Sequence, residues 1–162
     1  MTSRLLLPLL FALPLAAQNP GPVGDWALAS APDLAKVIAA ATAPMNFITR
    51  PIARARLAKT NEAYRTVRIQ REAGTIAITY DQRQPQLMPA DGRSVDWTRE
   101  DGEKFRISAR MDQDDLVQTY QAEDGARTNV FHVDPASHNL TLAVTISSPR
   151  LPGPLTYTLS YR

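Results

Sequence analysis

The segment Leu140-Thr-Leu-Ala-Val-Thr-Ile-Ser147 places a large apolar side chain at every second position. A second segment, Leu155-Thr-Tyr-Thr-Leu-Ser-Tyr-Arg162, shows the same alternation. A period of two is typical of a β-strand with one buried face and one solvated face. Residues 148–154, between the two segments, contain three prolines, which lack the N–H group that a central strand donates. Because two half-buried strands are not stable alone, the preceding residues must supply the rest of a sheet.

Strand-like runs follow one another from Thr66 onward, separated by turn residues. We predict strands at residues 66–71, 75–80, 84–88, 93–98, 104–111, 116–121, 128–133, 140–147 and 155–162. The dipeptides Asp91-Gly92, Asp101-Gly102 and Asp124-Gly125 indicate hairpin turns, because aspartate and glycine accept positive φ angles. With an earlier strand at residues 24–29, the pattern predicts an all-β fold, an antiparallel up-and-down barrel of about ten strands.

Two short helices are predicted between the first strand and the rest of the sheet. Ser30 is the expected cap of the first helix, and Thr49 is the expected cap of the second. The second helix is rich in Arg and Lys, and its thin apolar stripe consists of Ile52, Ala55 and Ala58. With so little apolar surface, this helix is expected to cover the barrel as a lid rather than to build its core.

The first residues have the pattern of a secretory signal peptide at 1–17, in which Arg4 precedes an apolar run and Ala17 ends it. An uncleaved anchor is the alternative. Residues 18–23 have the composition of a linker, and residues 24–162 are long enough for one domain. The chain is therefore expected to be secreted or periplasmic. The sequence contains no cysteine, which excludes disulfides, thiolate metal sites and a cysteine nucleophile.

Several short motifs resemble those of the intracellular fatty-acid-binding proteins, which belong with the lipocalins to the calycin superfamily. Gly24-Asp-Trp26 is similar to the Gly-x-Trp of the first calycin strand, and Asn46-Phe-Ile-Thr-Arg50 lies where the family has Phe-x-Thr-Arg. Leu116-Val-Gln118, Gly125 and Thr158-Leu-Ser-Tyr161 match further family positions. The resemblance implies a ligand-binding barrel closed by a helical lid. The export signal points to a lipocalin-like, exported bacterial relative rather than to a cytosolic family member.

The resemblance also assigns roles to single residues. Tyr161 matches the last-strand tyrosine that holds a ligand carboxylate in the family, but Leu159 stands where the family has arginine. A second family arginine aligns with His132, so the anion clamp of the family is absent or changed. In calycins a late arginine commonly lies over the first-strand tryptophan, which makes Arg162 the structural partner expected for Trp26. The alternative is that Arg162 belongs to a frayed terminus.

The barrel interior and its portal are the expected ligand site, because small-molecule sites are largely apolar with a few aimed polar groups. We therefore predict an exported binding protein for a small hydrophobic or amphipathic ligand, such as a fatty-acid-like lipid. The alternative is a solid barrel that serves as a non-catalytic structural or interaction module of the cell envelope. The predicted ligand-binding residues are Phe47, Ile52, Ile69, Ile78, Trp97, Phe105, Ile107, Gln118, Tyr120, His132, Leu142, Leu159 and Tyr161.

Other functional classes have little support in the sequence. There is no motif for a catalytic nucleophile, a metalloprotease or a phosphate-binding loop, so we expect no enzyme activity and no cofactor. Two histidines without a spaced carboxylate partner do not predict a metal site. A formal net charge of +2 gives no electrostatic footprint for nucleic acid. The basic second helix is expected to make transient contact with an anionic membrane, where each Lys or Arg contributes about 1 kcal/mol.

Overall fold

The computed structural model describes residues 21–162, which form ten strands and two helices. The strands are β1 Gly24–Ser30, β2 Thr66–Glu72, β3 Thr75–Tyr80, β4 Gln86–Pro89, β5 Val95–Thr98, β6 Lys104–Asp112, β7 Asp115–Ala122, β8 Gly125–Val133, β9 Leu140–Ser147 and β10 Leu155–Tyr161. The helices are α1 Leu34–Thr42 and α2 Thr49–Thr60. The predicted signal peptide lies outside the described residues. No helix within residues 21–162 is long and apolar enough to cross a membrane.

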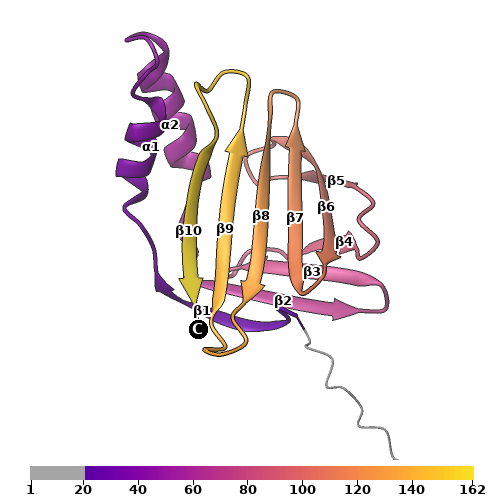
Figure 1. Cartoon of the computed structure of the whole chain (residues 1–162). Helices are drawn as coiled ribbons and strands as arrows, with labels where there is room; N and C mark the ends of the chain where they lie inside the picture. Colours follow the sequence, from indigo (N-terminus) through magenta and orange to yellow (C-terminus); the bar gives the residue numbers. More distant parts are fainter. Residues whose placement is uncertain (1–20) are drawn as a thin grey trace, which may run out of the picture.

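The strands form one antiparallel sheet in the order β4-β3-β2-β1-β10-β9-β8-β7-β6-β5. Strand β1 joins the two halves of the sheet, because it pairs with both β2 and β10. The sheet curls so that β1–β3 run across the lower ends of β7–β10 (Figure 1). The end strands β4 and β5 do not pair with each other, and the isolated bridge between Asp91 and Arg110 lies near this gap. The predicted up-and-down barrel is confirmed, in a nearly closed form.

The turn at Asp91-Gly92 is not the predicted hairpin, because the strands on either side of it do not pair. The Asp91 carboxylate instead accepts the backbone N–H of Arg93 at 3.0 Å, which is the geometry of an Asx turn. The turn at Asp101-Gly102 does join the paired strands β5 and β6, and Gly102 has a φ of 86° there. A dipeptide that favours positive φ therefore predicts a turn, but it does not show that the flanking strands pair.

Both helices begin differently from the prediction. Ser30 ends β1, and the cap of α1 is Asp33, whose carboxylate accepts a backbone N–H of the first turn at 3.2 Å. Thr49 is already helical in α2, and the side-chain oxygen of Asn46 accepts the backbone N–H groups of Ile48 and Thr49. In each helix a carboxylate or amide near the expected position supplies the acceptor that the free N–H groups require.

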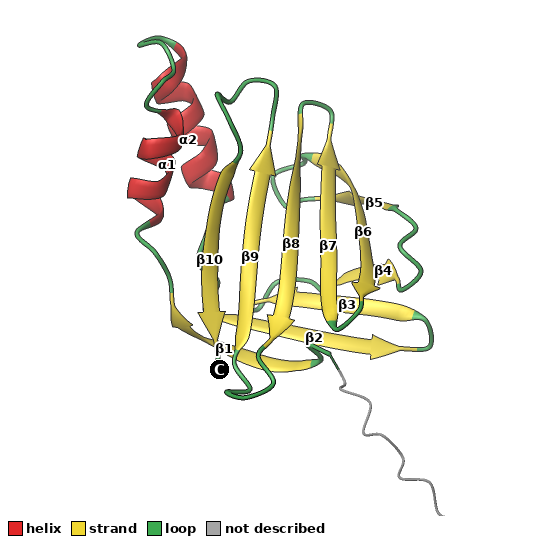
Figure 2. Cartoon of the chain, viewed as in Figure 1, coloured by secondary structure: helices red, strands yellow, loops and turns green. Residues whose placement is uncertain are grey.

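The two helices lie side by side next to the upper part of β10 (Figure 2). The predicted apolar stripe of α2 is wrong, because its members are exposed: Ile52, Ala55 and Ala58. Leu57, which is 8% exposed, faces the barrel instead. Leu57 is the one residue of α2 that joins the hydrophobic core, so the helix mainly covers the barrel, as the composition predicts.

The predicted contact between Arg162 and Trp26 is wrong, because no such cation–π pair occurs within residues 21–162. The indole N–H of Trp26 donates to the carbonyl of Pro22 at 2.9 Å. The alternative of a frayed end is also wrong. The backbone N–H of Arg162 donates to the carbonyl of Ala27, and the N–H of Ala27 donates back to Arg162, both at 2.9 Å. The last residue thus closes the sheet with its backbone.

Buried side chains fill the lower half of the barrel, the half crossed by β1–β3 in Figure 1. Strands β9 and β10 place Leu142 opposite Leu159 and Leu140 opposite Tyr161, and all four side chains are fully buried. The other strands add fully buried side chains, among them Ile69, Ile78, Leu116 and Phe131. This half is therefore a packed core that supplies stability.

A layer of hydrogen-bonded polar side chains lies above this core, and we call it the polar layer. The amide of Gln118 accepts from Tyr80 at 2.6 Å and donates to Gln86 at 2.7 Å. Tyr120 donates to the same oxygen of Gln86 at 2.6 Å. Asn129 donates to both Tyr80 and Gln118. Because buried polar groups are costly unless paired, these five side chains hold one another in place.

We predict that Leu142→Ala lowers the free energy of unfolding by about 2–5 kcal/mol, because the change leaves a void in packed surroundings. Leu87→Ala is the matched control. Leu87 is 59% exposed, and its change should cost less than about 0.5 kcal/mol. Urea denaturation measures both. Equal losses in the two variants would mean that the lower barrel is not packed.

We predict that stability falls as the pH rises above 10, because burial raises the pKa of Tyr120 to about 12 in the folded chain. The unfolded tyrosine loses its proton near pH 10 and the folded one does not. The free energy of unfolding therefore decreases as the pH rises further. The loss is about 1.4 kcal/mol per pH unit until the folded group ionises. Urea denaturation between pH 9 and pH 11 should show a shallower decline for Tyr120→Phe. Identical slopes would contradict the buried hydroxyl.

Candidate functional site

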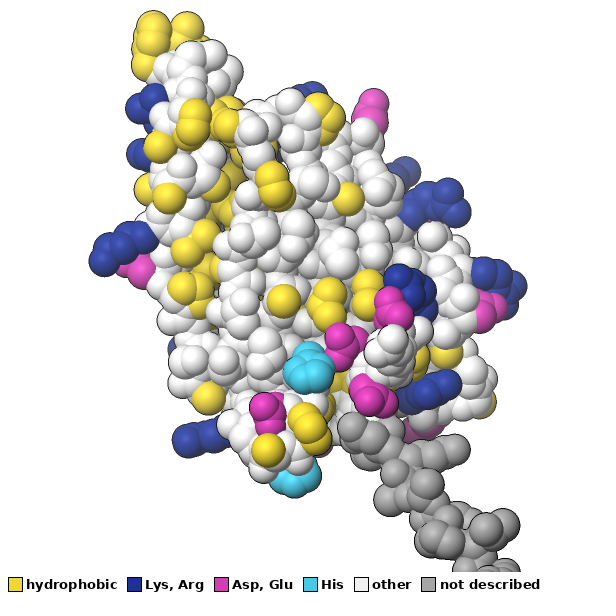
Figure 3. All heavy atoms as spheres, in the orientation of Figure 1, with side chains coloured by type: hydrophobic (Ala, Val, Ile, Leu, Met, Phe, Trp, Pro, Cys, Tyr) yellow, Lys and Arg dark blue, Asp and Glu magenta, His cyan; other side chains and the backbone are white. Residues whose placement is uncertain are grey.

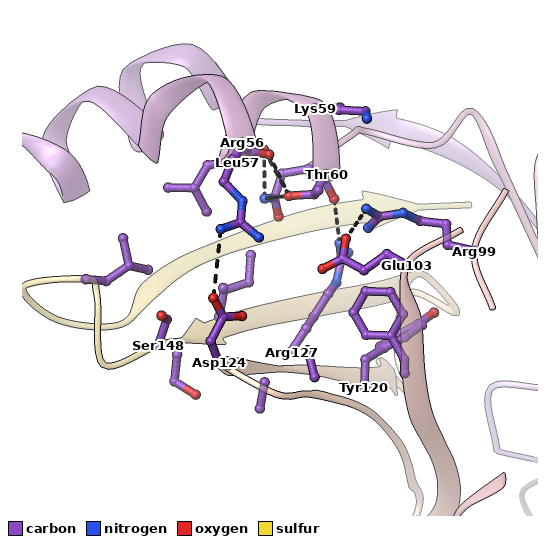
Figure 4. A pocket seen from close by; sticks show the side chains of 18 of the residues that line it. Arg56, Leu57, Lys59, Thr60, Arg99, Glu103, Tyr120, Asp124, Arg127 and Ser148 are labelled. Carbon is purple, nitrogen blue, oxygen red and sulfur yellow. Dashed lines mark hydrogen bonds and ion pairs between the residues drawn. The ribbon is translucent and has the colours of Figure 1, made fainter. Parts of the chain in front are cut away.

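A cavity of about 750 Å³ lies in the upper half of the barrel, beneath α2. Its walls are the upper ends of β5–β9 and the loop that follows β9. Tyr80, Gln86 and Tyr120 of the polar layer form its floor. Figure 4 looks into this space with α2 above it. The barrel therefore consists of a packed lower half and a hollow upper half, divided by the polar layer.

Apolar side chains cover much of the cavity wall. Trp97, Phe105 and Tyr120 pack together with ring centroids 5.8–6.2 Å apart, two of the three pairs edge to face. Such spacings are typical of favourable aromatic contacts. Leu57 and Leu151 add aliphatic surface from the lid and from the loop after β9. This combination suits the apolar part of a small molecule.

The lid helix α2 is tethered to two hairpins by ion pairs. Arg56 lies 3.8 Å from Asp124 in the β7–β8 turn, as Figure 4 shows, and Lys59 lies 3.4 Å from Asp101 in the β5–β6 turn. Both basic side chains are more than half exposed, and exposed pairs contribute only about 0–1 kcal/mol. Leu57 is the one buried residue of α2, so few apolar contacts hold the lid against the barrel.

Charged residues surround the mouth of the cavity. Arg99 donates to Asp101 at 2.8–2.9 Å and also pairs with Glu103. The hydrogen bond from Arg99 holds the pKa of Asp101 well below its usual range. Arg83 pairs with Glu62 on another part of the rim. The charged groups at the mouth of the cavity therefore form ion pairs with one another.

Arg127 of β8 lies between the polar layer and the lid. Its Nε donates to the side-chain oxygen of Asn129 at 2.9 Å, and its Nη1 donates to the backbone carbonyl of Thr60 at 3.3 Å. Thr60 is the last residue of α2, and Figure 4 shows Arg127 extending toward it beside Tyr120. The guanidinium stays charged at any physiological pH. A positive charge is thus fixed inside the cavity.

The structure brings only some of the predicted ligand-binding residues to the cavity. Ile52, Trp97, Phe105 and Tyr120 line it. Phe47 is 83% exposed on the turn between the helices and does not line it. The remaining residues of β2–β10 that point inward lie at or below the polar layer: Ile69, Ile78, Ile107, Gln118, Leu142, Leu159 and Tyr161. Alternation along a strand predicts which side chains point inward, but not how deep in the barrel they lie.

The inward position predicted for His132 is wrong. Its side chain is 51% exposed and its Nδ1 lies 2.6 Å from the carboxylate of Asp115. Asn129 and Phe131, both fully buried, hold the inward positions of β8. Figure 3 shows the histidines on the outer surface. Val130 and Phe131 are adjacent apolar residues, so the sequence of β8 is compatible with either face.

Sequence reasoning missed Arg127, Leu57 and Leu151. Arg127 follows from the alternation once Phe131 is assigned to the interior, because residues at steps of two share a face. Leu57 had a weak signal, as an isolated leucine in a basic helix. Leu151 lies in the proline-rich loop after β9, where no periodicity exists to reveal which side chain turns inward.

No protein-family model matches the sequence, and no curated protein matches it by sequence. Solved structures do resemble it. An abundant heat soluble (SAHS) protein from Ramazzottius varieornatus gives a TM-score of 0.59 at 10% identity, covering 86% of this chain and 93% of that one. The fatty acid transporter REP1-NXSQ gives 0.55 at 15% identity, with coverages of 86% and 93%. A Schistosoma mansoni fatty acid binding protein in complex with arachidonic acid gives 0.53 at 17%, with the same coverages.

Identities this low show a shared fold. The likeness covers 86% of this chain and nearly all of each neighbour, so it extends over most of the described fold. The resemblance inferred from Gly24-Asp-Trp26 and from the order of the elements is confirmed at this level. The chain has the fold of the fatty-acid-binding proteins and related calycin barrels.

Proposed function

We propose that this chain binds a small hydrophobic or amphipathic molecule, such as a fatty-acid-like lipid, in the cavity beneath α2. The observation that carries the proposal is the cavity itself, about 750 Å³ with an aromatic and aliphatic wall. Sites for small molecules commonly measure about 300–1,000 Å³. Each methylene of the ligand that leaves water contributes about 0.8 kcal/mol, so a short chain suffices for binding.

The cavity also weighs against a solid barrel that acts only as a structural module. The lower half is indeed packed, but the polar layer ends that packing and leaves the upper half hollow. Two neighbours in fold support the ligand class, since one is a fatty acid transporter and another is a binding protein in complex with arachidonic acid. The role is therefore carriage or storage rather than catalysis. Residues 1–17 support a secreted or periplasmic setting for it.

The turn between the helices supports a loading step at an anionic membrane. Phe47, Ile48 and Ile52 are 83%, 63% and 59% exposed, and Figure 3 shows apolar side chains gathered at the tip of the helical hairpin. Arg50 and Arg54 lie on the same helix, and their side chains donate to neutral oxygens of Met45, Thr42 and Ala39 rather than to carboxylates. Apolar groups beside cations suit an interface of anionic lipid, which attracts each charge with about 1 kcal/mol.

Tryptophan fluorescence tests the binding site. We predict that fatty acids of ten to sixteen carbons change the emission of Trp97, which lines the cavity, because the ligand excludes water from the indole. Trp26 does not line the cavity, so Trp26→Phe should keep the response and Trp97→Phe should lose it. A wild-type protein that responds to no fatty acid, retinoid or tetrapyrrole would contradict the proposal. So would a response that persists in Trp97→Phe.

Vesicle sedimentation tests the loading step. We predict that the protein binds phosphatidylglycerol vesicles more strongly than phosphatidylcholine vesicles, and that the double change Phe47→Ser, Ile48→Ser weakens this binding. Leu87→Ser on β4 is the matched control, since Leu87 is also exposed but lies on β4, distant in sequence from the helices. Equal binding to both lipids, or an unchanged double variant, would remove the membrane step while leaving the cavity proposal intact.

A further inference from the structure

Arg127 differs from the other cations that line the cavity. Five of them lie within ion-pair distance of a carboxylate: Arg56, Lys59, Arg83, Arg99 and Arg150. Within residues 21–162, no carboxylate lies within that distance of the Arg127 guanidinium. The rim charges are thus neutralised by their neighbours, whereas the charge deeper in the cavity is not.

The guanidinium of Arg127 also has donors to spare. Nε and Nη1 are used by Asn129 and by the carbonyl of Thr60, both neutral acceptors. Nη2 donates no hydrogen bond within residues 21–162, although the hydroxyl of Tyr157 lies beside the guanidinium and itself donates to Asn61. The guanidinium is partly shielded from water and has no counter-charge, and a carboxylate matches its two-pronged geometry. The unused N–H donors of Arg127 therefore suit a carboxylate that belongs to the ligand.

The inner face of β10, around Tyr161, is the other place where an anion could bind, but it does not suit an anion. The hydroxyl of Tyr161 is buried without a hydrogen-bond partner among residues 21–162, and Leu159 next to it on the same face is fully buried. Both lie in the packed half of the barrel, below the polar layer. A ligand cannot reach them without displacing the core, so its charged group must stay above the polar layer.

The sheet register places Arg127 next to apolar surface. Arg127 is opposite Tyr120 in the β7–β8 pair, and Tyr120 belongs to the aromatic cluster with Trp97 and Phe105. A ligand head group on Arg127 would therefore have an apolar wall directly beside it. The carbonyl of Thr60 on the other side places that head group beneath the end of the lid.

We infer that the occupant of the cavity is a carboxylate-bearing amphiphile whose head group binds Arg127 beneath Thr60. Its apolar part packs against Trp97 and Phe105, and the polar layer limits how deep it reaches. The inference rests on the proposed function and specifies the charge and the orientation of the ligand. It makes the lid side of the barrel, rather than its floor, the place where the charged group is recognised.

Three ligands with the same twelve-carbon chain test this inference: dodecanoate, dodecanol and dodecylammonium. Calorimetry at pH 8 should show that the wild-type protein binds dodecanoate roughly ten- to a hundredfold more tightly than dodecanol, the range expected for a charge-assisted contact. Dodecylammonium should bind most weakly. In Arg127→Gln the preference for dodecanoate should fall below about threefold, with the affinity for dodecanol unchanged. Circular dichroism verifies that the variant is folded.

Arg150→Gln is the matched control, because it removes one positive charge from the rim, where Arg150 already pairs with Asp124. It should keep the preference for dodecanoate. Equal affinity of the wild-type protein for the three ligands would overturn the inference and leave the binding function standing. So would an unchanged preference in a folded Arg127→Gln. Should Arg127→Gln not fold, the ranking of the three ligands by the wild-type protein decides. Failure of all three to bind would overturn the proposed function as well.

Discussion

The hydrogen bonds of the polar layer are the constraint on which the rest of the structure depends. Gln118 and Asn129 are fully buried at the middle of the barrel, where an amide without partners would be costly. Tyr80, Gln86 and Tyr120 satisfy them and close the packed core from above. Apolar side chains below this level pack against one another, whereas Trp97, Phe105 and Ile146 above it line the cavity. The packed core and the cavity thus occupy different halves of one barrel.

The lid contrasts with this rigid layer. Helix α2 buries one leucine, and its ion pairs to the hairpin turns are exposed to solvent. Contacts of that kind hold a helix in place without fixing it strongly. Two hydrogen bonds reach from the inner face of the barrel to the end of the lid, one from Arg127 to the carbonyl of Thr60 and one from Tyr157 to the side chain of Asn61. A group that binds Arg127 is therefore in a position to influence the closed lid directly.

The alternation of Leu140–Ser147 and its neighbours was sufficient to predict the barrel, since period two fixes both the strand and its inner face. It was not sufficient to predict the cavity. Leu142 and Trp97 both alternate correctly, yet one lies in the packed core and the other on the cavity wall, because depth depends on the curvature of the closed sheet. Along β8, the adjacent apolar residues made the inward face ambiguous. The sequence therefore predicted His132 in the site, whereas the structure has Arg127 there.

The most direct test of a barrel that is hollow only above the polar layer is a crystal structure with a fatty acid brominated at the end of its chain. Anomalous scattering from bromine locates the chain without relying on weak density for flexible carbons. The account predicts a bromine peak in the upper cavity beside Trp97 and Phe105, with the packed core unchanged. A peak among Leu142, Leu159 and Tyr161, or a crystal in which side chains fill the upper half, would contradict it.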